Sequence, residues 1–155
     1  MKLLAANKRM IARYAHELEQ MGGHSCHPSL CAILSAGLVE QDGCVLLAAH
    51  LPQPHIKRSD CGDSIGYECL INHLHLEDSV SGNLVANALC YLRLLSTELS
   101  RRFPQRQFMG VIAADDNDRE CNVRFHTPQP GRSWLADNLD AYDECVCVMQ
   151  LGSEV

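Results

Sequence analysis

The sequence lacks several features that would place it directly in a functional class. It contains no run of about 20 apolar residues, which argues against a membrane-spanning helix. Cations are in the minority, with 13 Lys and Arg against 19 Asp and Glu and a formal net charge of −6. A general nucleic-acid-binding protein needs a cationic surface to displace phosphate counterions, so this balance argues against that class. A basic protein remains a compatible partner.

The amino-terminal segment also lacks the pattern of a secretory signal peptide. Lys8 and Arg9 stand where the apolar stretch would be, and no small-residue cleavage site follows. We therefore expect a cytoplasmic protein. The nine cysteines are odd in number and occur in a chain of 155 residues, which is long enough to form its own core. They are interpreted as reduced, small apolar core residues and not as a disulfide framework.

The apolar spacing predicts two main helices within a single domain spanning residues 1–155. Residues 3–21 carry apolar side chains on one helical face, and Gly22 and Gly23 are expected to end this helix as a left-handed cap. Residues 83–103 carry a second stripe with spacings of three and four. Pro104 is expected to stop the second helix.

Short apolar or alternating runs predict about six strands, at 32–40, 44–51, 67–76, 107–114, 121–127 and 145–151. Asp42 and Gly43 predict a tight hairpin between the first two. Residues 52–66 are expected to form a surface loop, and residues 133–142 a short helix capped by Ser133. Consecutive hairpins and two amphipathic helices together predict an α+β fold, a mostly antiparallel sheet with the two main helices packed on it.

One cluster has the residue types of a metal site. His24, Cys26, His27 and Cys31 place four soft ligands within eight residues, and thiolate and imidazole are the ligands that zinc prefers. His73 and His75 could add ligands, because alternate strand residues share a face. The alternative is a polar turn with one or two buried cysteines, and we assign no metal and no cofactor.

Three other patterns suggest chemistry without establishing it. Residues 62–66 match the G-x-S-x-G pattern of a nucleophile elbow, but the expected loop before and strand after Ser64 are the wrong context. Cys145 and Cys147 share one face of a strand that we expect to be buried on both sides. A Cys61 and His55 pair is not singled out by any pattern. No catalytic residue is assigned.

The distribution of charge is the most distinctive signal. Residues 115–144 hold eight acids and three bases, a net −5 of the total −6. Two groups of acids flank strands that could neighbour each other, and their combined field would steer a cationic protein toward this face. The alternative is a solvated acidic surface that only promotes solubility. The candidate partner-binding residues are Asp115, Asp116, Asp118, Glu120, Asp137, Asp140, Asp143 and Glu144.

The stretch 121–148, CNVRFHTPQPGRSWLADNLDAYDECVCV, resembles the carboxy-terminal region of small cytoplasmic immunity proteins of bacterial polymorphic toxin systems, including contact-dependent growth inhibition. The resemblance implies a non-enzymatic inhibitor that binds a cognate toxin domain, often a basic nuclease, and blocks its active site or substrate path. It transfers no contact residue. Trp134, the single tryptophan, is interpreted as an anchor at the core or its rim.

Two alternatives remain open from the sequence. A secretion chaperone is also small and acidic, and it would form a homodimer with an exposed apolar groove for its client. A zinc-binding protein or enzyme would instead use the cluster from His24 to Cys31.

Overall fold

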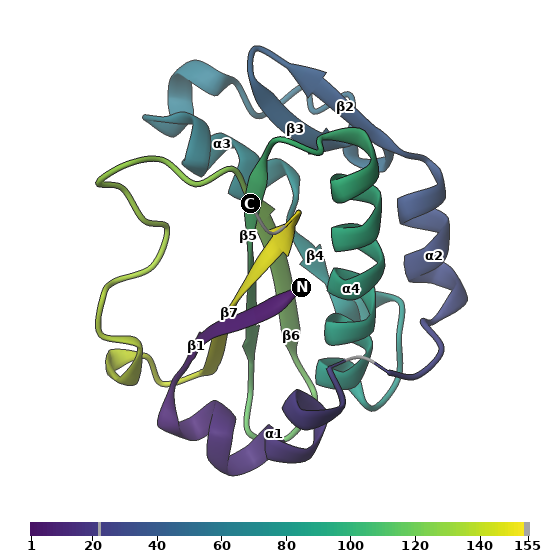
Figure 1. Cartoon of the computed structure of the whole chain (residues 1–155), viewed down its shortest axis with the longest axis vertical. Helices are drawn as coiled ribbons and strands as arrows, with labels where there is room; N and C mark the ends of the chain where they lie inside the picture. The colour runs from purple at the N-terminus through teal and green to yellow at the C-terminus, as the bar shows by residue number, and fades with distance from the viewer. Residues whose placement is uncertain (22, 154–155) are drawn as a thin grey trace.

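The computed structural model describes residues 1–21 and 23–153. The α+β class predicted from the sequence is confirmed, with a five-stranded antiparallel sheet of order β1-β7-β5-β6-β4 and a separate two-stranded hairpin (Figure 1). The strands are β1 Lys2–Ala6, β2 Leu38–Gln41, β3 Cys44–Leu47, β4 Leu74–His75, β5 Gln107–Ala114, β6 Cys121–His126 and β7 Cys145–Gly152. The helices are α1 Lys8–Gln20, α2 Pro28–Ser35, α3 Ser64–Ile71 and α4 Leu84–Arg102.

Helix α4 covers one face of the large sheet and forms the main core with it. Its apolar face is buried along most of its length, and strand residues such as Phe108 and Met149 are fully buried in the same cluster. Gly110 allows this close approach, because a Cβ there would lie 3.1 Å from Leu92 Cδ1. None of the helices in the described part of the chain has the length and apolar content needed to cross a bilayer.

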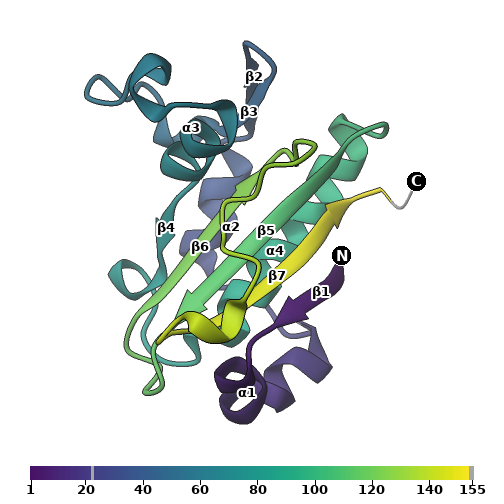
Figure 2. The same cartoon turned by 90° about the vertical axis from the view of Figure 1, so that its left-hand side faces the viewer.

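The opposite face of the sheet is crossed by residues 127–144, which we call the strap (Figure 2). The strap contains a single short 3-10 turn, Leu139–Ala141, within its described residues. Its beginning is held to α3, where Thr127 N donates to Glu68 Oε2 at 2.7 Å. Its end is held by Asn7, whose Nδ2 donates to the carbonyl oxygen of Glu144 at 2.8 Å. Both ends of the strap are therefore fixed by buried side chains.

Helix α3 also satisfies the free edge of the small hairpin. Asn72 Oδ1 accepts a hydrogen bond from Leu47 N at 2.9 Å, and Asn72 Nδ2 donates to Val45 O at 2.8 Å. Glu68 Oε1 accepts from Val45 N at 2.7 Å. These side chains replace a neighbouring strand along β3, which satisfies backbone groups that would otherwise be buried without partners.

Several predicted elements are confirmed. The hairpin turns at Asp42 and Gly43, which have φ values of 51° and 78°. Helix α4 and strands β5, β6 and β7 differ from the predicted ranges by one residue or less at each end. The predicted glycine cap of the first helix falls partly on residue 22, which lies outside the described residues. The described cap is Met21, with φ 47°.

The other predictions need correction. Residues 2–6 form strand β1, because Asn7 caps α1 by accepting from Met10 N, so the helix begins only at Lys8. Residues 28–35 form α2, which has a proline at its first position. Because this helix occupies part of the predicted first hairpin strand, the strand is shortened to Leu38–Gln41.

The predicted loop 52–66 is confirmed over residues 52–63, which hold only a short 3-10 segment, Arg58–Cys61. The predicted strand 67–76 is wrong, because α3 spans Ser64–Ile71 and leaves only Leu74–His75 as strand. This helix is buried on most sides, so its sequence shows no one-faced stripe. The expected helix at 133–142 is absent from the structure except for the 3-10 turn. Trp134 and Leu135 lie at a bend in the strap, and both line the same sheet-face cavities.

Candidate functional site

The two acidic segments meet at one end of the large sheet. Strands β5 and β7 are neighbours, with Ala114 paired to Cys145, so the turn after β5 and the strap residues before β7 lie side by side. Cys145 Sγ lies 3.2 Å from Asp116 Oδ1. This end of the sheet lies beside α1 in Figure 1. We call the eight predicted acidic residues, now in one region, the acidic end.

Two of these acids hold local backbone structure. Asp115 Oδ1 accepts from Arg119 N at 2.8 Å and from Glu120 N at 3.1 Å, which fixes the β5–β6 turn. Partial burial acts against ionisation of Asp115, but these backbone hydrogen bonds outweigh it and lower its pKa. Asp118 Oδ1 accepts from Leu84 N at 2.9 Å and thereby caps α4.

Two more acids pair with α1. Asp116 Oδ2 lies 3.3 Å from Arg9 Nη1, and Asp140 Oδ2 lies 3.4 Å from Lys8 Nζ. Lys8 N also donates to Asp140 Oδ1 at 2.8 Å, and this bond lowers the pKa of Asp140. The cations of α1 therefore offset part of the negative charge, a contact that the sequence did not reveal.

The remaining four acids are exposed, and within the described residues no ion pair of theirs is formed. They are Glu120, Asp137, Asp143 and Glu144. Their charges face water while the other acids fix the backbone around them. The acidic end thus presents unpaired carboxylates on a backbone that the other four acids fix by hydrogen bonds and ion pairs.

The cluster from His24 to Cys31 does not form a metal site in the structure. Among residues 1–21 and 23–153, no group of three or more His, Cys, Asp or Glu side chains is placed to hold a metal ion. His27 Nδ1 instead accepts from Ser29 N at 3.3 Å at the start of α2. Burial raises the pKa of Cys26 to about 12, and the nearby Cys90 and Cys31 thiols add to this shift.

The other sequence patterns have structural partners. Ser64 begins α3 after a 3-10 segment, and its hydroxyl accepts from Gln129 Nε2 of the strap. A helix does follow the serine, which corrects the expected strand, but no strand precedes it. Cys61 Sγ donates to Lys57 O, so the structure gives it a backbone partner. Both Cys145 and Cys147 are buried free thiols.

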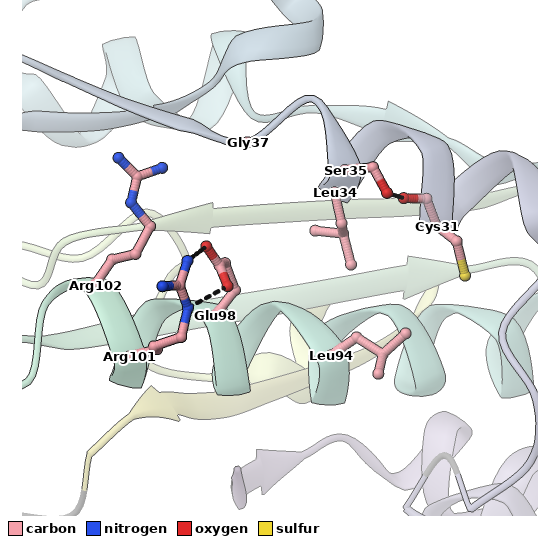
Figure 3. Close-up of a pocket in the computed structure, with 8 residues that line it drawn as sticks. All are labelled: Cys31, Leu34, Ser35, Gly37, Leu94, Glu98, Arg101 and Arg102. Carbon is pink, nitrogen blue, oxygen red and sulfur yellow. Dashed lines mark hydrogen bonds and ion pairs between the residues drawn. The ribbon is translucent and has the colours of Figure 1, made fainter.

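A pocket of about 580 Å³ lies between α2 and the end of α4 (Figure 3). Its charged side chains have partners within the protein. Arg101 forms a two-point contact with Glu98, with its Nη2 2.6 Å from Glu98 Oε1, and Arg102 Nη1 donates to Leu38 O at 2.6 Å. The Arg101 charge is thus neutralised by Glu98, whereas Arg102 is bonded to a carbonyl oxygen and forms no ion pair within residues 1–21 and 23–153.

A second region of interest lies between the strap and the outer face of the sheet. Trp134 and Leu135 of the strap separate two cavities there, of about 90 and 260 Å³. Trp134 lies over the sheet, with the Arg124 Cζ atom 5.6 Å from its ring centroid. The predicted role of Trp134 as an anchor at the rim of the core fits this placement.

Comparison with known proteins adds a family. The model of the family described as Uncharacterized protein PM0498 family matches residues 5–154. The chain belongs to the PM0498 family. No curated protein and no solved structure gives a significant match. The family match spans both the acidic end and the sheet-face cavities of this PM0498-family protein.

Sequence reasoning missed the polar residues under the strap. In β6 the side chains alternate, so Asn122, Arg124 and His126 face the strap while their neighbours enter the core. A charged residue in the middle of a strand that lies inside a sheet was the available signal. His73, placed just before β4, joins this group through Asn122.

Proposed function

We propose that this PM0498-family protein is an immunity protein that binds a cationic toxin domain through its acidic end. The observation that carries the proposal is the convergence of two acidic segments, one from the β5–β6 turn and one from the strap, at one end of the sheet. Four of the eight acids there have no ion pair within the described residues. A field of this kind attracts a basic protein and orients it before contact.

Some of the acids hold the backbone and others are free to contact a partner, which supports a preorganised surface. Asp115 and Asp118 hold the turn and the start of α4, so the backbone carrying Glu120 is fixed before a partner arrives. Asp140 and its Lys8 contact hold the strap in the same way beside Asp143 and Glu144. Binding then requires little ordering of the surface, which lowers the entropic cost of association.

The test is the neighbouring gene. If it encodes a toxin domain, its product should arrest growth when expressed alone and be harmless when this protein is co-expressed. The two proteins should co-purify as a complex whose association rate falls with increasing salt. Growth arrest that this protein does not relieve would contradict the proposal.

The contact surface is tested by charge reversal at the unpaired acids. We expect the triple variant Glu120→Lys, Asp143→Lys and Glu144→Lys to slow association about ten-fold or more at low salt. The control reverses Asp42 of the hairpin turn and Asp60 before α3, exposed acids at the opposite end of the molecule (Figure 1). The control should change the rate about two-fold or less, and equal effects of both variants would exclude the acidic end as the contact surface.

A further inference from the structure

Arg124 is a charged residue placed inside a covered face of the sheet. It lies on β6, between β5 and β4, and its side chain faces the strap while Val123 and Phe125 enter the core. Its Nη2 lies 3.1 Å from His73 Nε2, and the Trp134 ring lies over its guanidinium group. Both neighbours can contact the guanidinium group, but a neutral imidazole and an indole supply no negative charge.

The guanidinium group is incompletely satisfied. Its Nε is buried without a hydrogen-bond partner, and in the described part of the chain no carboxylate lies within ion-pair distance of Arg124. Burial lowers the pKa of Arg124, and the nearby Cys69 thiol and Glu144 carboxylate only partly oppose this effect. Arg124 is half-buried, and a charge removed from water without a counter-ion is costly, so the site favours an anion from outside the chain.

Room for such an anion lies directly beside Arg124. The cavity of about 260 Å³ has an apolar floor formed by Val111 and Ala113 of β5 and Val146 of β7. Trp134 forms part of its wall. Arg124 and Asn122 supply polar groups to the same cavity. A small number of polar groups on an otherwise apolar lining is typical of sites for small organic ligands.

We propose that this cavity binds a small carboxylate carried on a flat apolar body, with Arg124 pairing the carboxylate and Trp134 and Val111 contacting the body. The planar guanidinium edge matches a carboxylate with two parallel hydrogen bonds. Glu144, which also lines the cavity, disfavours a doubly charged group such as phosphate. The cavity and the acidic end share Glu144, but the proposed ligand contacts are Arg124 and Trp134, so benzoate binding and toxin binding can fail separately.

A purely anchoring role for Arg124 makes a different prediction. If Arg124 only holds Trp134 and the strap against the sheet, added carboxylates should leave the Trp134 environment unchanged. Trp134 is the single tryptophan of the chain, so its fluorescence and its indole N–H resonance report on the two cavities that it lines, without any labelling. Ala113 lines only the larger cavity, so a substitution there separates the two.

The experiment titrates the full-length protein with benzoate, benzamide and cyclohexanecarboxylate while following the Trp134 signals. We expect saturable binding of benzoate with a dissociation constant of about 1 mM or below. Benzamide lacks the charge and should bind at least about ten-fold more weakly. Cyclohexanecarboxylate keeps the charge but is not flat, and it should be weaker than benzoate. Equal responses to benzoate and benzamide, or none to either, would overturn the proposal.

Two variants test the site by separate routes. Arg124→Met removes the charge and should weaken benzoate binding about ten-fold or more. Ala113→Leu fills the cavity without touching Arg124 and should abolish binding, which keeps the test decisive if Arg124→Met fails to fold. The control Arg119→Met removes an exposed cation from the β5–β6 turn and should bind benzoate like the natural protein. Undiminished binding by Ala113→Leu would place benzoate elsewhere and reject the cavity.

Discussion

Asp118 caps helix α4 from a turn that lies 34 residues further along the chain. Its Oδ1 accepts a hydrogen bond from Leu84 N at 2.9 Å. The local residue, Asn83, has a left-handed backbone with φ 51° and forms no side-chain cap. The β5–β6 turn and the start of the longest helix therefore stabilise each other, which assigns a structural role to one of the predicted binding acids.

The first prediction concerns this cap. Asp118→Ala should lower the free energy of unfolding by about 1 kcal/mol, because a capping oxygen at a helix start contributes on that scale. Asp118→Asn keeps an oxygen and should lose less. Urea unfolding followed by circular dichroism measures both. Asp137→Ala, on the exposed strap, should change the stability by less than about 0.5 kcal/mol. An equal loss in this control would refute the capping role.

The second prediction concerns Asn72, which links α3 to two sheets. Besides its bonds to β3, its Nδ2 donates to Phe125 O of β6 at 3.1 Å. Asn72→Ala would leave several buried backbone groups without partners, so we expect a loss of about 3 kcal/mol in the free energy of unfolding. The exposed Asn117→Ala is the matched control. A loss no larger than that of the control would show that water replaces the amide.

The amount of the fold that the sequence predicts depends on how each element is buried. Helix α4 has one apolar face toward the sheet, and β5 to β7 end at polar turns, so periodicity located them. Helix α3 was not predicted, because it is buried on most sides and its polar residues, Glu68 and Asn72, form hydrogen bonds to strands. Strand β1 was predicted as part of the first helix, because its apolar residues continue the spacing of α1. Only its pairing with β7 distinguishes the strand from the helix.

The third prediction is a pH dependence that arises from His73. Burial lowers the pKa of His73 below its usual 6.5, and the neighbouring Arg124 acts in the same direction. Below pH 6.5 the unfolded chain therefore takes up a proton at this residue before the folded chain does. Stability should fall as the pH decreases from about 7 toward about 5.

Urea unfolding at several pH values checks this prediction. The variant His73→Gln should reduce the fall in stability between about pH 7 and pH 5, because it removes the titrating group. His16→Gln, on the exposed face of α1, should leave the profile unchanged. A steep profile that persists in His73→Gln would assign the titration to another residue.

The fourth prediction concerns the thiols. Six of the nine cysteines are buried, and burial raises the pKa of Cys69 and Cys147 to about 12. Brief treatment of the native protein with iodoacetamide should modify the three partly exposed thiols before any buried one, as mass spectrometry of peptides would show. These are Cys26, Cys31 and Cys61. Cys26 should react slowly among the three, because its pKa is raised to about 12. Rapid labelling of Cys147 without denaturant would contradict the buried arrangement.

The candidate sites were less accessible to sequence reasoning than the fold. Charge density located the acidic residues, but it could not separate those that bond to backbone, such as Asp115, from those that face water, such as Asp143. The cavity at Arg124 depends on a strap without regular structure, and no local pattern predicts how such a segment crosses a sheet. The role of each acid and the presence of the cavity both depend on which residues are close in space, and short sequence patterns do not encode this information.

The pairing of β1 with β7 has a consequence for synthesis. Lys2 pairs with Gln150 and Ala6 with Cys147, so the first strand made lies beside the last. β7 also separates β1 from β5 in the sheet. β1 therefore has no strand to pair with until residues 145–152 have been synthesised, whereas β5 and β6 can pair earlier, so joining β1 to the sheet is a late step of assembly.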